Sequence, residues 1–230
     1  MALAGEGAVC IWNDITAEGR DEFYAWHISE HMPERVGIPG FRRGRRYVAV
    51  TTATSPEFFT LYETDSPEVL VGQDYLNRLN NPTPWTRRVM PAFRKTSRAL
   101  TRVRASFGQG PGGVLATLRF SGVAGGEEAM VRAFATDILP KTALLPQITG
   151  AHLCLTDQAA SATATTESKD RTDSQAAPSW VVLIEGCNLA AVERAVEASL
   201  HGPRFAANGP AACGLYRLEH TRLKTASAAR

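Results

Sequence analysis

The order of predicted secondary structure occurs twice along the chain of 230 residues, and this repeat restricts the available folds more than any other feature. In the first half, strand-like runs at 8–14, 41–50, 58–63 and 99–107 alternate with helix-like runs at 16–32 and 67–79. In the second half, strand-like runs at 114–120, 149–156, 180–185 and 213–220 alternate with helix-like runs at 127–139 and 189–200. Each half therefore consists of a strand, a helix, two strands, a helix and a strand.

Proline positions support a duplication of one ancestral unit. Pro33 corresponds to Pro140, and Pro39 corresponds to Pro146, both at an offset of 107 positions. Because a residue before proline is disfavoured in a helix, we expect the first helix to begin near Thr16 and to end at Met32.

The repeated order predicts the fold class. A strand–helix–strand–strand–helix–strand unit is the ferredoxin-like arrangement, whose antiparallel sheet carries both helices on one face. Because the other sheet face is apolar and must be covered, two units are expected to lay these faces together as a barrel-like core. We therefore expect an α+β chain with ferredoxin-like repeats at 1–110 and 111–230. The polar, Ala-rich and Ser-rich segment 157–179 is predicted to be a long, mobile surface insertion, with an active-site lid as the alternative.

Composition excludes several classes of protein. The chain is 44% apolar, and its formal net charge of +2 gives no support for nucleic-acid or membrane-surface binding. It has neither an apolar run of about 18 residues nor a signal peptide, so we expect a cytoplasmic protein without a membrane partner. The four cysteines form no CxxC pair, which argues against a zinc site, and all four are predicted to be inert core residues.

The densest group of polar and aromatic residues is the segment 26–47, WHISEHMPERVGIPGFRRGRRY. Its WHxxEHMPER…IPGF…RY pattern resembles the dimeric α/β-barrel superfamily, and is similar to the EthD-like and stress-responsive branches. The resemblance covers about the first 110 residues and extends to the run LNNPTPWTRRVMPAF at 79–93. It implies the fold but no single activity, because the superfamily includes isomerases, polyketide cyclases, monooxygenases and heme proteins.

His27 and His31 lie four residues apart and therefore share one face of the first helix. The corresponding positions of the second half hold Phe134 and Ile138, so this face points inward and both histidines are predicted to be buried. Three interpretations remain open. The histidines form a structural pair bonded to Glu30, Glu34 or the backbone, they perform acid–base catalysis, or they bind a metal whose third ligand is not evident. For proton transfer we rank His31 first, because it lies at the end of the helix nearest a cavity mouth.

The strand FRRGRRY carries four arginines. Strand alternation places Arg43, Arg45 and Tyr47 on one face, where a guanidinium group needs an internal carboxylate, solvent or an anionic ligand. If the partner is a ligand, these three residues and the indole of Trp85 would bind the substrate.

The leading hypothesis is a cofactor-independent isomerase, lyase or cyclase that acts on a small aromatic or carboxylate-bearing metabolite. His31 would transfer the proton, and His27 and Glu34 would orient it. One alternative is a heme-binding barrel oxidoreductase, for which the resemblance to heme-binding relatives makes His201 the candidate axial ligand. The other is a non-catalytic stress-response or ligand-binding barrel. Each repeat could pair within the chain or across a homodimer.

Overall fold

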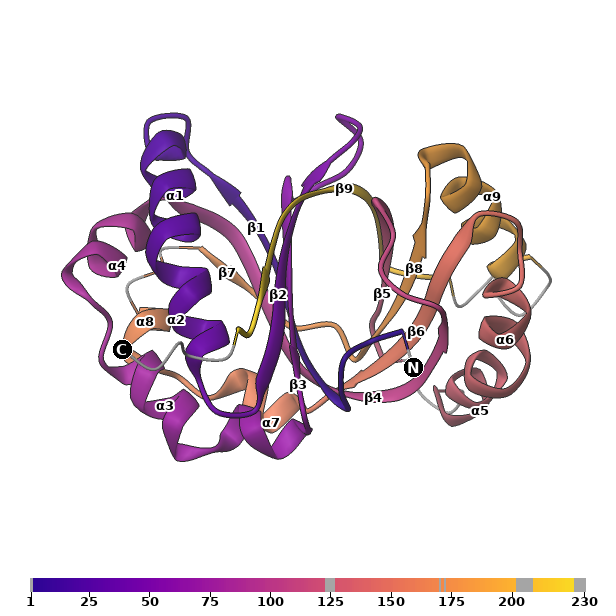
Figure 1. Cartoon of the computed structure of the whole chain (residues 1–230), viewed down its shortest axis with the longest axis horizontal. Helices are drawn as coiled ribbons and strands as arrows, with labels where there is room; N and C mark the ends of the chain where they lie inside the picture. Colours follow the sequence, from indigo (N-terminus) through magenta and orange to yellow (C-terminus); the bar gives the residue numbers. More distant parts are fainter. Residues whose placement is uncertain (1, 123–126, 170, 172, 202–208, 226–230) are drawn as a thin grey trace.

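Eight strands form a closed barrel in the computed structural model, which describes residues 2–122, 127–169, 171, 173–201 and 209–225 (Figure 1). The strand order is β1-β3-β2-β9-β5-β8-β6-β4, and the pairing of β1 with β4 closes the ring. All pairings within the ring are antiparallel. The barrel strands are β1 (Gly7–Ile15), β2 (Phe41–Ala49), β3 (Phe58–Thr64), β4 (Phe93–Gly108), β5 (Val114–Phe120), β6 (Ile148–Thr156), β8 (Trp180–Gly186) and β9 (Ala212–Leu223).

Each half of the barrel is one ferredoxin-like sheet, as the sequence predicts. The first half has the order β4-β1-β3-β2 and the second half has the order β9-β5-β8-β6. The β2–β9 and β4–β6 pairings join the two sheets, so the barrel closes within a single chain.

Helices cover the two sheets on opposite sides of the barrel (Figure 1). The first half carries α1 (Arg20–Trp26), η1 (His27–His31), α2 (Met32–Gly37), η2 (Pro67–Val71), α3 (Gln73–Asn80), α4 (Pro84–Val89) and η3 (Met90–Ala92). The second half carries α5 (Glu127–Ala133), η4 (Phe134–Ile138), α6 (Leu139–Thr142) and α9 (Leu189–Ser199). Alternation along the strands divides the core into a barrel interior that includes Trp12 and Phe59 and separate clusters beneath each helical layer.

The predicted end of the first helix at Met32 is wrong. The five residues of η1 form a π-helical turn, in which the Met32 N–H bonds to the carbonyl oxygen of His27. The helix then continues through Pro33 as α2 to Gly37, because a proline at the start of a helical segment has no N–H that needs a partner. The π-helical turn η4 occupies the equivalent position of the second half, directly before Pro140. The two turns place His27 and His31 where the second half has Phe134 and Ile138.

The segment 157–179 is folded against the first half, which differs from the predicted mobile surface loop. It contains α7 (Gln158–Ala162), α8 (Thr166–Lys169) and the short strand β7 (Ser174–Gln175). β4 pairs with β6 only from Thr101 onward, so its first residues have an edge on which β7 pairs in parallel. The Thr166 N–H also donates to Asn80 Oδ1 of α3 at 3.1 Å. The insertion of the second repeat therefore covers part of the first.

Two of the four cysteines are not core residues. Cys10 and Cys154 are buried in the barrel interior, whereas Cys187 and Cys213 are exposed. Cys187 follows the end of β8, and Cys213 is the second residue of β9, so neither lies where a strand is covered on both faces. In the part of the chain that the structure describes, no helix is both long and apolar enough to cross a membrane.

Candidate active site

Strand alternation places the predicted substrate-binding residues Arg43, Arg45 and Tyr47 inside the barrel. Arg45 is fully buried and donates to Glu185 at 2.6 and 3.0 Å, to Glu63 at 3.0 Å and to the Tyr47 hydroxyl at 2.6 Å. Arg43 donates to Glu63 at 2.8 and 2.6 Å. Both guanidinium groups therefore bond to internal carboxylates.

Other groups complete this barrel cluster of Arg43, Arg45, Tyr47, Glu63, His152 and Glu185. The Ala4 N–H donates to Glu63 at 2.7 Å, and His152 Nδ1 lies 2.9 Å from Ser106 Oγ. Burial opposes ionisation of Glu185, but Arg45 and His152 lower its pKa to about 2. The cluster is thus a charge-paired part of the core.

His27 and His31 lie on the other side of the sheet, beneath the first helical layer, and both are buried as predicted. An Nη1–H of Arg46 donates to His27 Nδ1 at 3.4 Å, which places the proton of a neutral His27 on Nε2. The His31 ring lies 5.5 Å from the His27 ring and 4.2 Å from the Trp26 ring, measured between centroids. The structure therefore keeps the two histidines together but separates them from Arg43, Arg45 and Tyr47.

His31 faces Tyr62, whose ring centroid lies 6.3 Å from its own. His31 Nδ1 and Tyr62 Oη are both buried, and neither has a hydrogen-bond partner among the described residues. A buried polar atom without a partner costs about 1–3 kcal/mol, and most such atoms in native proteins are satisfied. Two such atoms on neighbouring rings make this the part of the first helical layer with unused hydrogen-bonding capacity.

Residues of the insertion enclose this pair of groups. The buried Arg35 of α2 forms an ion pair with Glu167 of α8, and Arg171 Nη2 donates to Glu167 Oε1 at 2.9 Å. The resulting outer-face cluster consists of His27, His31, Arg35, Tyr62, Glu167 and Arg171. The aromatic ring and polar tip of Tyr62 make it a possible pocket-lining residue from sequence alone. The sequence gives no site role to Arg35, Glu167 and Arg171, because Arg35 and Glu167 are 132 positions apart and the insertion has no periodic pattern.

Electrostatics keep the reactive groups of this outer-face cluster neutral. Burial lowers the pKa of His31 well below its ordinary value, and the nearby charges of Arg35 and Arg171 lower it further. Burial also lowers the pKa of His27 well below its ordinary value, and the neighbouring His31 and Arg46 lower it further. Burial raises the pKa of Tyr62. At neutral pH the cluster therefore offers a neutral imidazole with an unprotonated ring nitrogen and a phenol that can donate a hydrogen bond.

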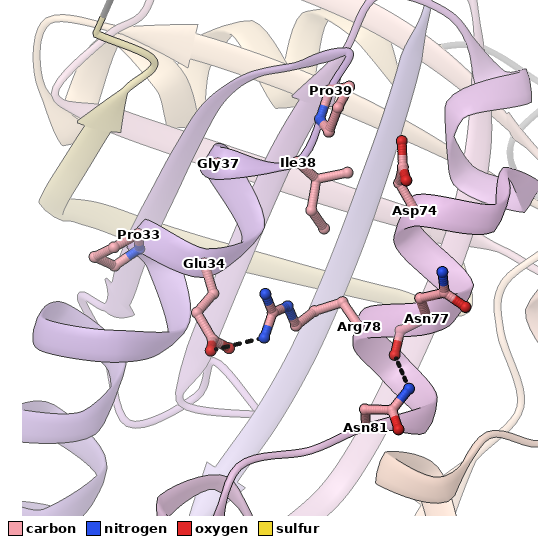
Figure 2. Close-up of a pocket in the computed structure, with 9 residues that line it drawn as sticks. All are labelled: Pro33, Glu34, Gly37, Ile38, Pro39, Asp74, Asn77, Arg78 and Asn81. Carbon is pink, nitrogen blue, oxygen red and sulfur yellow. Dashed lines mark hydrogen bonds and ion pairs between the residues drawn. The ribbon is translucent and has the colours of Figure 1, made fainter. Parts of the chain in front are cut away.

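Glu34 does not bond to His31. It lines a groove of about 570 Å³ between α2 and α3, where it accepts a hydrogen bond from Arg78 at 3.1 Å (Figure 2). Trp85 lies on α4, outside the barrel, and its Nε1–H donates to Glu22 at 2.6 Å. Neither residue lies with Arg43, Arg45 and Tyr47 in the barrel cluster.

The described residues around His201 do not fit a heme. His201 is exposed just beyond α9. The sheet face beneath α9 is filled by Phe120 and Trp180, whose rings stack at 3.7 Å, and by Phe134 at 5.5 Å from Trp180. An axial histidine needs an apolar slot beside it for the macrocycle, so heme has no part in the reaction proposed below. Among the described residues, no three His, Cys, Asp or Glu side chains are grouped to hold a metal ion.

Comparison with known proteins supports the fold assignment. No family model and no curated protein matches the sequence. Among solved structures, an anthrone oxidase-like protein is similar over 97% of this chain and 96% of its own, with a TM-score of 0.59 and 12% identity. A putative monooxygenase from Lactobacillus acidophilus is similar over 95% and 96%, with a TM-score of 0.52 and 10% identity. A putative chlorite dismutase is similar over 94% and 96%, with a TM-score of 0.54 and 12% identity.

These similarities define the class of fold. The chain has an α+β fold of two ferredoxin-like units that close into one antiparallel barrel, and it shares this fold with these solved structures.

Proposed function

We propose that the protein is an oxidoreductase that removes a proton from a small aromatic carbon acid at the outer-face cluster and oxidises the resulting anion with dioxygen. The observation that carries this proposal is the pair of buried, unpartnered atoms His31 Nδ1 and Tyr62 Oη, which belong to rings with centroids 6.3 Å apart. The EthD-like resemblance of the segment 26–47 is compatible with it.

The first step is proton abstraction. Neutral His31 takes a proton from a C–H group that is conjugated to a ketone through an aromatic ring, and the electron pair of that bond delocalises into an enolate. The Tyr62 hydroxyl donates a hydrogen bond to the enolate oxygen, and the buried charges of Arg35 and Arg171 stabilise the negative charge. His27 holds its proton on Nε2 and contributes no positive charge beside His31.

The second step consumes dioxygen. The carbanion forms a carbon–oxygen bond with dioxygen, and protonated His31 returns its proton to the peroxide oxygen. Loss of water then leaves a new carbonyl, so that one CH₂ group and one O₂ molecule become one C=O group and one water molecule.

The names of the structural neighbours support the oxidative outcome over the isomerase, lyase or cyclase reaction that the sequence alone favours. An anthrone oxidase-like protein and a putative monooxygenase are both among them. Proton abstraction is common to both hypotheses, and they differ in whether dioxygen is consumed.

The insertion must move for a substrate to enter. His31 and Tyr62 are 5% and 2% exposed, and the insertion contributes Glu167 and Arg171 above them. Its hydrogen bond to α3 is exposed, and the two residues of β7 that pair with β4 are exposed, which suits a segment that opens and closes. Such movement corresponds to the active-site lid, the alternative interpretation of the segment 157–179 in the sequence analysis.

Anthrone, a tricyclic ketone with an acidic CH₂ group, is the probe for this proposal. We expect the wild-type protein to consume dioxygen with anthrone and to form anthraquinone, measured with an oxygen electrode and by absorbance. His31→Gln should lower the rate by about 100-fold or more, because a positioned general base contributes about 10²–10⁴-fold. Tyr62→Phe should lower it by about 100-fold, as loss of an oxyanion donor does elsewhere.

His201→Gln is the matched control, because it removes an exposed histidine and should leave the rate unchanged. Exchange of the CH₂ protons in D₂O without oxygen uptake would support the isomerase-type hypothesis instead. If the wild-type protein catalyses neither exchange nor oxygen uptake, or if His31→Gln keeps the full rate, the proposal is wrong.

A further inference from the structure

A second pocket, of about 340 Å³, lies between β4 and the insertion. Thr96 and Arg98 line it from β4, and Ser161, Ser168 and Arg171 are among the residues that line it from the insertion. Its described lining includes two arginines and several hydroxyl groups but no carboxylate. The pocket therefore has a net positive lining.

The positive charge of this pocket is not neutralised by its neighbours. Arg98 is half-buried and makes no ion pair within the described part of the chain. The Arg171 side chain is 8% exposed, and its Nε–H is buried without a hydrogen-bond partner. The carboxylate of Glu167 bonds to Arg171 but is shared with Arg35. Glu167 is thus shared by two arginines, of which Arg35 also lies 3.9 Å from Glu34, and Arg98 has no carboxylate partner among the described residues.

Hydroxyl groups add to this lining. Thr96 Oγ1 is buried without a partner, and Thr96 is only 3% exposed. The backbone N–H of Leu100 donates to Ser161 Oγ at 3.0 Å, which leaves the Ser161 hydroxyl proton free to be donated. Unpartnered N–H and O–H donors around one cavity match a ligand that has only acceptor atoms.

We propose that this pocket binds a compact oxyanion, a carboxylate or a phosphate, between the guanidinium groups of Arg98 and Arg171. The planar fork of a guanidinium group matches the paired oxygens of either anion. Thr96 Oγ1 supplies a hydrogen bond from the floor of the pocket. The site is distinct from the proton-transfer pair, because it requires neither His31 nor Tyr62.

Titration with two probes at constant ionic strength tests this site. Inorganic phosphate represents a free anion, and benzoate represents the carboxylate end of an organic ligand. Binding is measured by isothermal titration calorimetry on the full chain. We expect saturable binding of at least one probe. Arg98→Met should weaken it by about 10-fold or more, because a hydrogen bond to a charged group contributes about 1.5–3 kcal/mol.

Arg104→Met is the matched control, since Arg104 is an exposed arginine on the same strand outside the pocket, and its affinity should stay within about twofold of wild type. Arg98→Lys keeps the charge without the fork and should bind with intermediate affinity. Binding of phosphate alone assigns a free-phosphate site, and tighter binding of benzoate assigns a carboxylate site. The proposal is overturned if neither probe binds saturably, or if Arg98→Met and Arg104→Met bind as wild type does.

Discussion

Replacing Arg45 by methionine should destabilise the protein more than any other single change in the barrel cluster. The Arg45 side chain is fully buried and donates to Glu63, to both carboxylate oxygens of Glu185 and to Tyr47. Without it, Glu185 keeps only the Gly112 N–H at 3.0 Å and a weaker approach from His152. Because breaking a buried pair leaves an uncompensated charge, the expected loss is about 3–5 kcal/mol, or about 6–20 °C in melting temperature.

Two companion variants separate the charge effect from lost packing. Arg43→Met should cost less, about 1–3 kcal/mol, because Glu63 keeps its bond to Arg45. Adding Glu185→Gln to Arg45→Met removes the orphaned charge and should restore about 1–2 kcal/mol. Urea unfolding followed by tryptophan fluorescence measures all three variants, and unchanged m-values would show that the denatured state is unaffected.

The same experiment has a defined pH dependence. In the wild-type protein the folded pKa of Glu185, about 2, lies below its ordinary value of 4.5, so its contribution is present above pH 4.5 and lost as pH falls. In Arg45→Met, burial without the arginine should raise this pKa, so the variant should gain stability relative to wild type as pH falls toward 4.5. A loss below about 1 kcal/mol for Arg45→Met, or a double variant that is less stable than it, would refute the reasoning.

Three further predictions concern the first helical layer. Between pH 7.5 and 5.5 the free energy of unfolding should fall by about 1.4 kcal/mol for each of the two buried histidines, because the unfolded imidazoles bind protons below about pH 6.5 and the folded ones do not. Urea unfolding of His31→Gln should show about half of the total decrease expected for His27 and His31 together. Glu167→Gln leaves Arg35 buried without its carboxylate, and should cost about 3–5 kcal/mol, with faster amide hydrogen exchange across the insertion; unchanged exchange would contradict the docking. Pro33→Ala should change the melting temperature by less than about 3 °C, because the π-helical turn before it already removes the need for a backbone N–H at position 33.

The sequence predicted the elements of the fold well because alternation and proline positions are local signals. The strand at 114–120 matches β5 residue for residue, and the parity that places Arg45 and Tyr47 on one face is confirmed. The π-helical turn was missed because no residue type is typical of hydrogen bonds to residue i−5 instead of i−4. The prolines at an offset of 107, Pro33 and Pro140, each lie two residues after the end of a turn.

The candidate site was only half visible in the sequence. The spacing of His27 and His31 identified two of its residues, and the apolar residues at the equivalent positions of the other half predicted their burial. Tyr62 could be named from its residue type only as a possible pocket-lining residue, and Glu167 and Arg171 were missed because their importance depends on long-range neighbours. A loop rich in Ala, Ser and Thr shows no preference for the surface on which it docks.

The docking of the insertion has a consequence for biosynthesis. Glu167 and Arg171 are translated more than 100 positions after Arg35, which they help to enclose in the site. A ribosome that has released only the N-terminal half has made both histidines but not the segment that covers them. Because domains fold in the order in which they emerge, Arg35 in the nascent first half should have only the more distant Glu34, at 3.9 Å, as a counter-ion until the second half follows. Expression of the first half by itself should therefore give a protein that binds chaperones or aggregates, and the proposed oxidation should require both halves of the barrel.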